Sequence, residues 1–261
     1  MSRDHAALDS AIARWTARSD PRLRALAADM RVAMLRERGR LRAARALADS
    51  LLAADSTAFP ILVLASTRAA LADTGVAALF RSSINRPLRL PLDGAQARGF
   101  AWTRAHEADV TSPWADTAHL RALADSIELV GARSYYGRDW LLAHHVRGLV
   151  AARGGRHAEA VGHLERARYL PAGWTRTNVE LAQASLALGR AADAVAVLRD
   201  AYTGSHDAMG RYVTRSELDW WMARALAAAG QGDSARLYAA RARQAWAQAD
   251  PEVAARLAAL P

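Results

Sequence analysis

The 261-residue chain contains no cysteine and no lysine, so all 35 of its basic residues are arginine. Without cysteine it has no disulfide, no thiolate nucleophile and no cysteine-ligated zinc or iron–sulfur site. Without lysine it lacks an amine for Schiff-base chemistry and the phosphate-binding lysine of P-loop proteins and kinases. Aromatic residues are also scarce, at 7%, whereas alanine makes up about a quarter of the chain. Because alanine is the best helix former, this composition favours closely packed helices.

Long apolar runs are absent as well. The most apolar stretch, Phe59–Leu64, is far shorter than the roughly 20 residues that a membrane-spanning helix needs. The first ten residues lack the apolar core of a signal peptide. We therefore expect a cytoplasmic protein with no membrane segment.

Positive charge is concentrated near the start of the chain. Residues 1–90 contain 15 arginines and 8 acidic residues, whereas residues 91–261 contain 20 and 18. The first third is therefore a candidate electropositive surface. A GC-rich genome is the simpler explanation for the exclusive use of arginine, since arginine codons are GC-rich and lysine codons are not.

Helical periodicity dominates the sequence, and no run alternates in the manner of a strand. Pro21 is placed to begin a helix, Gly39 ends it, and a second amphipathic helix follows, which predicts an antiparallel hairpin. Residues 85–94 hold two prolines and a glycine and cannot form a regular helix. We place a boundary there, between a divergent helical-hairpin region (1–90) and a second helical region (91–261).

From Trp140 onward the sequence repeats itself. Residues 154–167 match residues 188–201 at an offset of 34 positions, and residues 229–242 form a third copy after a seven-residue insertion. Small residues recur at fixed positions in the copies: Ala160, Ala194 and Ala235, and the turn glycines Gly155, Gly189 and Gly230. Small side chains let the two helices of a hairpin pack closely, and Gly148 acts in the same way from the opposite helix.

This pattern resembles the tetratricopeptide repeat, a helix–turn–helix unit of the same length. The likeness is good over residues 140–201, fair over 214–250 and weak before 135. The chain is also similar to the repeat-containing C-terminal regions of large bacterial regulators. The resemblance implies an all-α fold, a right-handed α–α superhelix of stacked antiparallel hairpins, with a capping helix from Pro251 and a concave face lined by the first helix of each hairpin.

Groove-facing positions of the family fall on nine residues of this chain: Leu142, His145, Leu149, Arg176, Val179, Gln183, Glu217, Trp220 and Arg224. Such a mixture suits an extended peptide or a partner helix. Trp220 and Arg224 lie one helical turn apart and resemble an interface anchor. We therefore expect a non-catalytic protein-interaction scaffold or sensor module, serving bacterial signalling or transcription regulation. The alternative use of this face is packing against another domain of the same protein.

A second candidate function is nucleic-acid association through the arginine-rich segment 31–45. Phosphate binding needs arginines that converge on one face, preferably with aromatic residues for stacking. No aromatic residue interrupts this segment, so a solvated helix face is the simpler interpretation.

No motif predicts catalysis, a cofactor or a metal site. The eight histidines include no HExxH arrangement, and no serine lies in a GxSxG elbow. His106 and Asp109 share a helical face, but two ligands alone hold a metal poorly. The glycines of residues 230–234 follow no strand and form a repeat turn rather than a phosphate loop. The identity of a partner and the oligomeric state are left open by the sequence.

Overall fold

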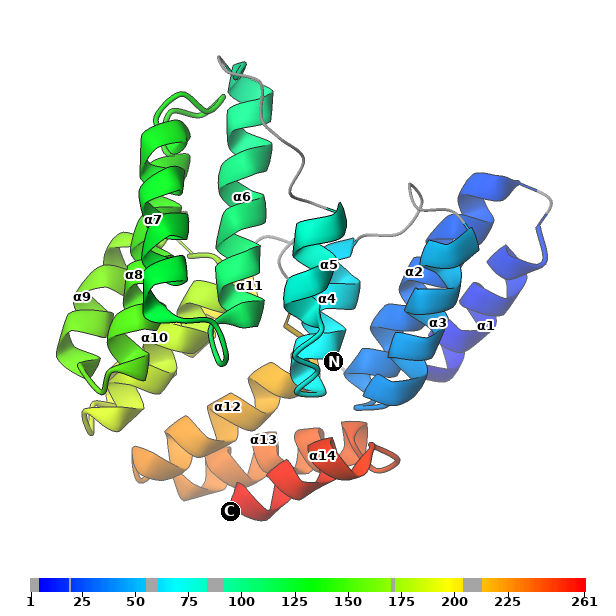
Figure 1. Cartoon of the computed structure of the whole chain (residues 1–261). Helices are drawn as coiled ribbons and strands as arrows, with labels where there is room; N and C mark the ends of the chain where they lie inside the picture. Colours follow the sequence, from blue (N-terminus) through cyan, green and yellow to red (C-terminus); the bar gives the residue numbers. More distant parts are fainter. Residues whose placement is uncertain (1–4, 19, 55–60, 84–91, 170–171, 204–212) are drawn as a thin grey trace.

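The computed structural model describes residues 5–18, 20–54, 61–83, 92–169, 172–203 and 213–261, and every regular element in these ranges is helical (Figure 1). This confirms the predicted all-α class. The α-helices are, in chain order, α1 His5–Thr16, α2 Pro21–Glu37, α3 Leu41–Ala54, α4 Ile61–Ala70, α5 Val76–Ser83, α6 Gly94–Thr111, α7 Thr117–Gly131, α8 Leu142–Arg153, α9 His157–Arg166, α10 Thr175–Ala187, α11 Ala191–Thr203, α12 Arg215–Ala228, α13 Gly232–Ala245 and α14 Pro251–Ala254. Short 3-10 helices cover Asp139–Leu141 and Ala255–Ala259.

Several helices begin where the sequence supplies a local cap. Pro21 occupies the first turn of α2, and the carboxylate of Asp20 accepts a hydrogen bond from the Arg22 amide at 2.8 Å. Asp93 and Gln96 form a reciprocal capping box at the start of α6. These caps satisfy amide groups that have no acceptor inside the helix.

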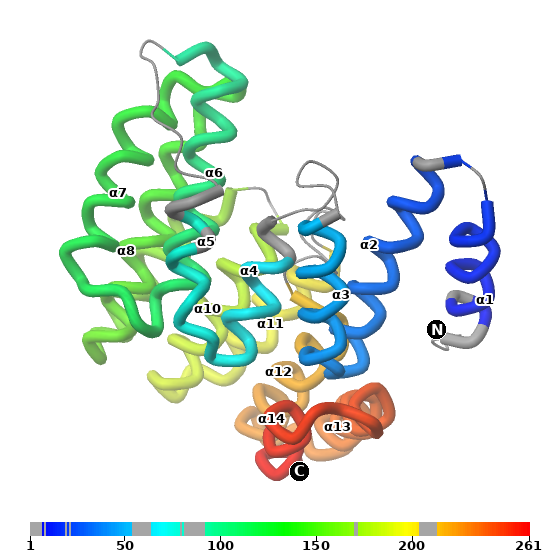
Figure 2. Tube along the Cα trace, turned by 45° about the vertical axis from the view of Figure 1, so that its right-hand side comes forward, coloured from blue at the N-terminus to red at the C-terminus, as the bar shows by residue number. Residues whose placement is uncertain are grey.

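The predicted repeats form three helical hairpins, α8–α9, α10–α11 and α12–α13 (Figures 1 and 2). Their turn glycines all adopt the left-handed conformation, with φ of +70° at Gly155, +73° at Gly189 and +73° at Gly230. The recurring alanines of the second helices are completely buried, as expected. A Cβ atom at Gly148 would lie 2.6 Å from Leu164 Cγ, so only glycine permits the observed approach of α8 and α9.

The N-terminal helices share a core with the start of the second region. Phe80 and Leu64 are fully buried in a cluster that also contains Val110 of α6. The boundary predicted at residues 85–94 falls mostly outside the described residues, and the two-region division stays a prediction. None of the helices described is both long enough and apolar enough to cross a lipid bilayer.

The two ends of the helical array touch each other. The Ser216 hydroxyl donates to the Glu37 carbonyl oxygen at 2.7 Å, which joins the end of α2 to the start of α12. The Asp250 amide donates to the Gly39 carbonyl oxygen at 3.0 Å, and the Asp250 carboxylate accepts from the Arg42 amide at 2.7 Å. Figures 1 and 2 show one end of the α2–α3 hairpin lying beside the C-terminal segment.

The C-terminal segment covers the last hairpin, but it is shorter than a regular capping helix. It consists of the single turn α14 and a 3-10 helix. Val253 and Leu260 from this segment are buried against Trp220 and Trp246. The segment therefore protects the apolar end of the array and at the same time contacts the N-terminal hairpin.

Candidate functional site

A polar cavity of about 360 Å³ lies between the N-terminal helices, α10 and the C-terminal segment. We call it the central cavity. Its polar and aromatic lining comes from five helices or their caps (α2, α4, α6, α10 and α12), from the residue after α13 and from the C-terminal segment: Arg36, Ser66, Asp109, Ser112, Arg176, Glu180, Gln183, Thr214, Glu217, Trp246 and Arg256. The cavity therefore depends on segments from both ends of the chain and from its middle.

An ionic network forms the wall of the cavity on the side of α10. Arg176 Nε lies 3.1 Å from Asp109 Oδ2, and Arg176 Nη1 lies 3.7 Å from Glu217 Oε1. Behind Asp109, His145 Nε2 is 3.4 Å from its other carboxylate oxygen, and His145 Nδ1 is 3.1 Å from Thr177 Oγ1. This network links α6, α8, α10 and α12 and fixes the position of the Arg176 guanidinium.

The pKa values of two carboxyl groups in this wall, Asp109 and Glu180, are shifted in opposite directions. Burial by itself raises the pKa of Asp109, but Arg176 and His145 outweigh it and hold that pKa below its ordinary value. Burial, helped by the charges of Asp109 and Glu217, raises the pKa of Glu180 to about 7. Gln183 Nε2 donates to Glu180 Oε1 at 3.3 Å. Glu180 therefore exchanges its proton near neutral pH, whereas Asp109 stays ionised.

His106, which shares a face of α6 with Asp109 as predicted, is buried among aromatic rings. Its ring centroid is 5.0 Å from that of Trp174 and 6.0 Å from that of Trp102. Burial lowers the pKa of His106 to about 4, although the charge of Asp109 opposes the shift. The ring is therefore neutral at pH 7, and its surroundings support packing rather than proton transfer.

Two hydrogen-bond donors at the C-terminal side of the cavity have no acceptor among the described residues. Trp246 is only 3% exposed, and its indole Nε1 makes no hydrogen bond. The Arg256 guanidinium lies 5.2 Å from the Trp220 ring, and no carboxylate in the described part of the chain forms an ion pair with it. Because Trp246 Nε1 itself has almost no accessible surface, the accessible positive group at this side of the cavity is the exposed Arg256 guanidinium.

Three of the nine residues predicted to face a groove line the central cavity: Arg176, Gln183 and Glu217. The structure thus brings together three of the five polar residues of the prediction.

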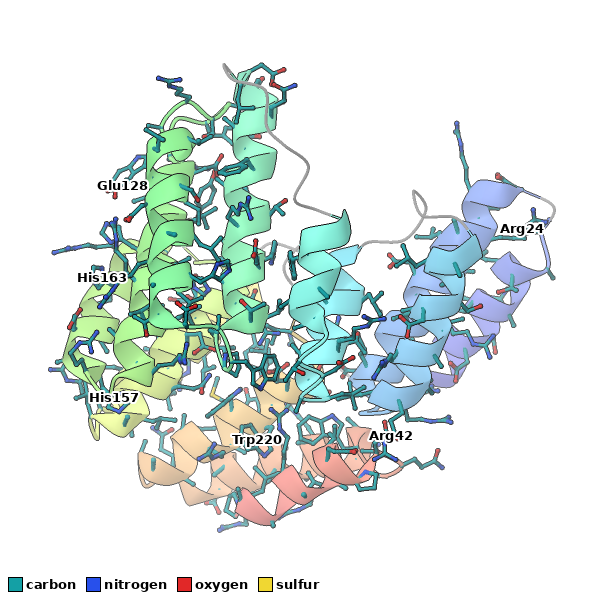
Figure 3. All side chains as sticks on the ribbon, viewed as in Figure 1. Arg24, Arg42, Glu128, His157, His163 and Trp220 are labelled. Atoms are coloured by element: carbon teal, nitrogen blue, oxygen red, sulfur yellow. The ribbon has the colours of Figure 1, made fainter. Side chains whose placement is uncertain are left out.

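Five other predicted groove residues are buried and cannot contact a ligand in this structure. Leu142, His145 and Leu149 of α8 lie beneath α6, which packs on the face that would otherwise be open. Val179 is buried in the core of the two hairpins α10–α11 and α12–α13. Trp220 lies under the C-terminal segment, and its Nε1 donates to the Arg256 carbonyl oxygen at 2.9 Å (Figure 3). The structure therefore gives these five residues almost no exposed surface, and their assignment to a ligand-binding groove stays a prediction.

Arg224, the ninth predicted residue, stacks on aromatic rings outside the cavity lining. Its guanidinium carbon lies 4.6 Å from the Trp220 ring and 4.9 Å from the Trp221 ring. Together with the burial of Trp220, this gives the pair a structural role in covering the last hairpin. It does not form the exposed interface anchor that the sequence suggested.

The most informative cavity residues were missed by sequence reasoning. Arg36, Trp246 and Arg256 are too far apart in the chain for any local pattern to group them. Glu180 could have been found, because it lies between Arg176 and Gln183 at helical spacing on one face of α10.

Many arginines of the N-terminal region are engaged in ion pairs. Arg38 pairs with Asp9 at 2.6 Å, and Arg68 pairs with Asp49 at 2.7 Å. Arg42 points toward the C-terminal segment and pairs with Glu252 (Figure 3). These contacts reduce the number of guanidinium groups available to phosphates on this surface.

Two histidines that the sequence did not pair meet on the outer side of the first repeat hairpin. The Nδ1 atoms of His144 and His163 lie 3.0 Å apart. Burial lowers the pKa of both rings, and each is lowered further by neighbouring positive groups. No set of three histidine or acidic side chains suited to a metal ion occurs within the described ranges.

The chain was compared with family models, with curated proteins and with solved structures, and none of them matched.

Proposed function

We propose that this chain is a non-catalytic sensor or interaction module of the tetratricopeptide-like kind, and that its central cavity receives a short segment of a protein partner. The observation that carries this proposal is the convergence of Arg176, Gln183 and Glu217 on one cavity. These three residues occupy inner positions of two successive repeat hairpins. A small set of fixed polar groups in a concave site is the arrangement by which pockets orient a ligand.

The rigidity of the polar wall supports a role in binding. Arg176 is held by Asp109 and Glu217, so its guanidinium is oriented before any partner arrives. A preorganised group loses little conformational entropy when it binds. The lining also includes apolar surface from Leu41, Val110 and Trp246, which can receive the apolar part of a partner side chain.

The test is selection of short random peptides displayed on phage against the whole chain. Ala70 is exposed and lines the cavity, so Ala70→Trp should fill its mouth without disturbing the core. Ala240 is an exposed alanine of α13 that lies outside the lining, and Ala240→Trp is the matched control. Selected peptides should bind the wild type and the control and should lose binding to Ala70→Trp. Equal binding to all three proteins would refute recognition in the cavity.

Nucleic-acid association is the alternative function. A salt titration separates the two functions, because phosphate binding weakens steeply with ionic strength and binding of an uncharged peptide does not. Binding of a DNA duplex that survives in physiological salt would favour the alternative.

A further inference from the structure

We infer that a second surface of this chain binds a single strand of nucleic acid, by stacking its bases on exposed tyrosines beside arginines. The surface is formed by the loop between α7 and α8 and by the neighbouring part of α6, and we call it the tyrosine–arginine patch. It consists of Arg98, Arg133, Tyr135, Tyr136 and Arg138. None of these residues lines the central cavity, so this inference goes beyond the proposed function and does not rest on it.

The two tyrosines of the patch are exposed, although aromatic side chains are usually buried. Tyr135 is 74% exposed and Tyr136 is 56% exposed. Their ring centroids lie 5.1 Å apart at an interplanar angle of 87°, so the edge of one ring meets the face of the other. Single exposed apolar side chains are common on protein surfaces, whereas contiguous ones mark interaction sites. The patch therefore offers open aromatic surface to a partner.

The loop that carries the tyrosines is held in place before any partner binds. The Tyr135 amide donates to the Gly94 carbonyl oxygen at 2.9 Å, which ties the loop to the start of α6. The Gly137 amide donates to the Ser134 carbonyl oxygen at 2.8 Å, which closes a turn around the two tyrosines. A preorganised loop loses little conformational entropy when it binds.

Two arginines stack on these rings. The guanidinium carbons of Arg98 and Arg138 lie 4.7 Å and 5.6 Å from the Tyr136 ring centroid. Arg98 is oriented by a completely buried carboxylate, because its Nη1 donates to Asp139 Oδ1 at 3.4 Å and to the Tyr169 hydroxyl at 3.0 Å. Both hydrogen bonds use the same nitrogen and the side chain is partly exposed, so the other N–H groups of Arg98 are available to phosphate oxygens.

The charge of the patch favours an anionic partner. Three guanidinium groups lie at or beside the tyrosines, and that of Arg133 is exposed and makes no ion pair with a described residue. Of the two carboxylates in the adjoining segments, Asp139 is buried behind Arg98, and Asp93 caps the start of α6. Positive charge is therefore in excess where the aromatic rings are open.

A single strand of nucleic acid uses both properties of the patch. Every base has a flat π face that stacks on an aromatic side chain in any sequence, and its phosphates attract arginine. An acidic peptide would use the arginines only, and a proline-rich peptide would use the rings only. In a duplex the base faces are already stacked on one another. DNA and RNA share the groups that the patch can contact, and the arginine-rich segment 31–45 has no such rings.

Fluorescence anisotropy of labelled dodecamers of thymidylate and of uridylate, titrated with the whole chain at low salt, tests the inference. At least one strand should bind, and the comparison shows whether DNA, RNA or both are accepted. A deoxyribose–phosphate dodecamer without bases is the control for charge alone. It should bind about tenfold more weakly than the active strand, the loss expected when base stacking is removed.

Tyr135→Ala should weaken binding of the active strand by about tenfold, whereas Tyr135→Phe keeps the ring and should bind as the wild type does. Tyr135 is exposed, so both variants should fold normally. Leu237→Ala truncates an exposed side chain of α13 and is the matched control that should leave binding unchanged. Ala70→Trp fills the mouth of the central cavity and should also leave strand binding unchanged, which separates this inference from the proposed function.

The inference is overturned if neither strand binds, if the strand without bases binds equally well, or if Tyr135→Ala binds in full. Arg31→Gln removes an exposed charge from the segment 31–45. A loss of binding in this variant alone would place the strand on the N-terminal helices and overturn the patch. Loss in Tyr135→Ala with recovery in Tyr135→Phe supports the patch, whether or not peptides bind in the central cavity.

Discussion

Two helical hairpins of this molecule use the same turn for different reasons. The α8–α9 hairpin turns at Gly155 with φ of +70°, and the α2–α3 hairpin turns at Gly39 with φ of +68°. A Cβ atom at Gly155 would meet nothing within 4 Å. A Cβ atom at Gly39 would lie 2.7 Å from Ala249 Cβ and 2.8 Å from Val253 Cγ1.

The comparison shows that one residue type can satisfy a local and a distant requirement at once. At Gly155 the backbone conformation alone calls for glycine. At Gly39 the C-terminal segment also approaches so closely that no side chain fits. In the sequence both glycines look like simple turns. In the structure only Gly39 also contacts the C-terminal segment and lines the central cavity.

The largest expected effect is a loss of stability on substitution of Gly39, compared with a smaller loss on substitution of Gly155. Gly39→Ala should lower the free energy of unfolding by about 3 kcal/mol, because it combines left-handed strain with a clash against Ala249 and Val253. Gly155→Ala should cost about 1 kcal/mol, because only the strain applies. Chemical denaturation of both variants measures the difference. Equal losses of stability in the two variants would show that the C-terminal segment does not pack closely against Gly39.

The next prediction concerns the ionic wall of the cavity. The pKa of Glu180 is about 7 in the folded chain and 4.5 ordinarily, so the group favours folding below pH 4.5, and this contribution is lost as the pH rises through 7. Glu180→Gln cannot ionise, and its stability relative to wild type should therefore increase by about 3 kcal/mol from pH 4 to pH 8.

The matched control is Glu159→Gln, which removes a carboxylate from an exposed position of α9. Its stability relative to wild type should change little over the same range. His106, with a pKa near 4, contributes to stability in the opposite sense, because its contribution is lost as the pH falls. This contribution is the same in wild type and in both variants, so it cancels when their stabilities are compared. If the stability of Glu180→Gln relative to wild type did not change between pH 4 and pH 8, Glu180 would not have a raised pKa in the folded chain.

A smaller effect tests the close packing of the regular repeats. Gly148→Ala places a methyl group 2.6 Å from Leu164 Cγ and should destabilise the chain by about 1.5 kcal/mol, even though alanine is the better helix former. Gly162→Ala in the neighbouring helix meets nothing within 4 Å and should stabilise by about 0.5 kcal/mol. Thermal and urea unfolding of the pair give the sign. Stabilisation by both substitutions would contradict the observed approach of α8 and α9.

The smallest expected effect concerns two helix N-caps, one supplied by a residue far away in the sequence and one by a residue of the same turn. Asp250→Ala removes the acceptor for the Arg42 amide at the start of α3, and Asp116→Ala removes the acceptor for the His119 amide at the start of α7. Each should cost about 1 kcal/mol. Hydrogen exchange should become faster at Arg42 in the first variant and at His119 in the second. Unchanged exchange at Arg42 would show that the ends separate in solution.

The sequence predicted the local elements well, because their determinants lie close together in the chain. The start of α2 at Pro21, the three repeat turns and the buried alanines of the second helices all follow from backbone preferences and helical spacing. The exposure of the inner face was predicted poorly. The resemblance to the tetratricopeptide repeat assigns Leu142 and Trp220 to inner positions, but α6 and the C-terminal segment cover them. No sequence pattern near either residue predicts that it is covered.

The sequence by itself therefore determined an all-helical chain, the places where it reverses, and the positions where only a small residue lets two neighbouring helices meet. Tertiary structure alone decided which polar residues surround the central cavity. The physical reason is the range of the interactions. Turn conformation and helix packing act over a few residues or one hairpin, whereas the hydrogen bond that closes the array joins residues 208 positions apart.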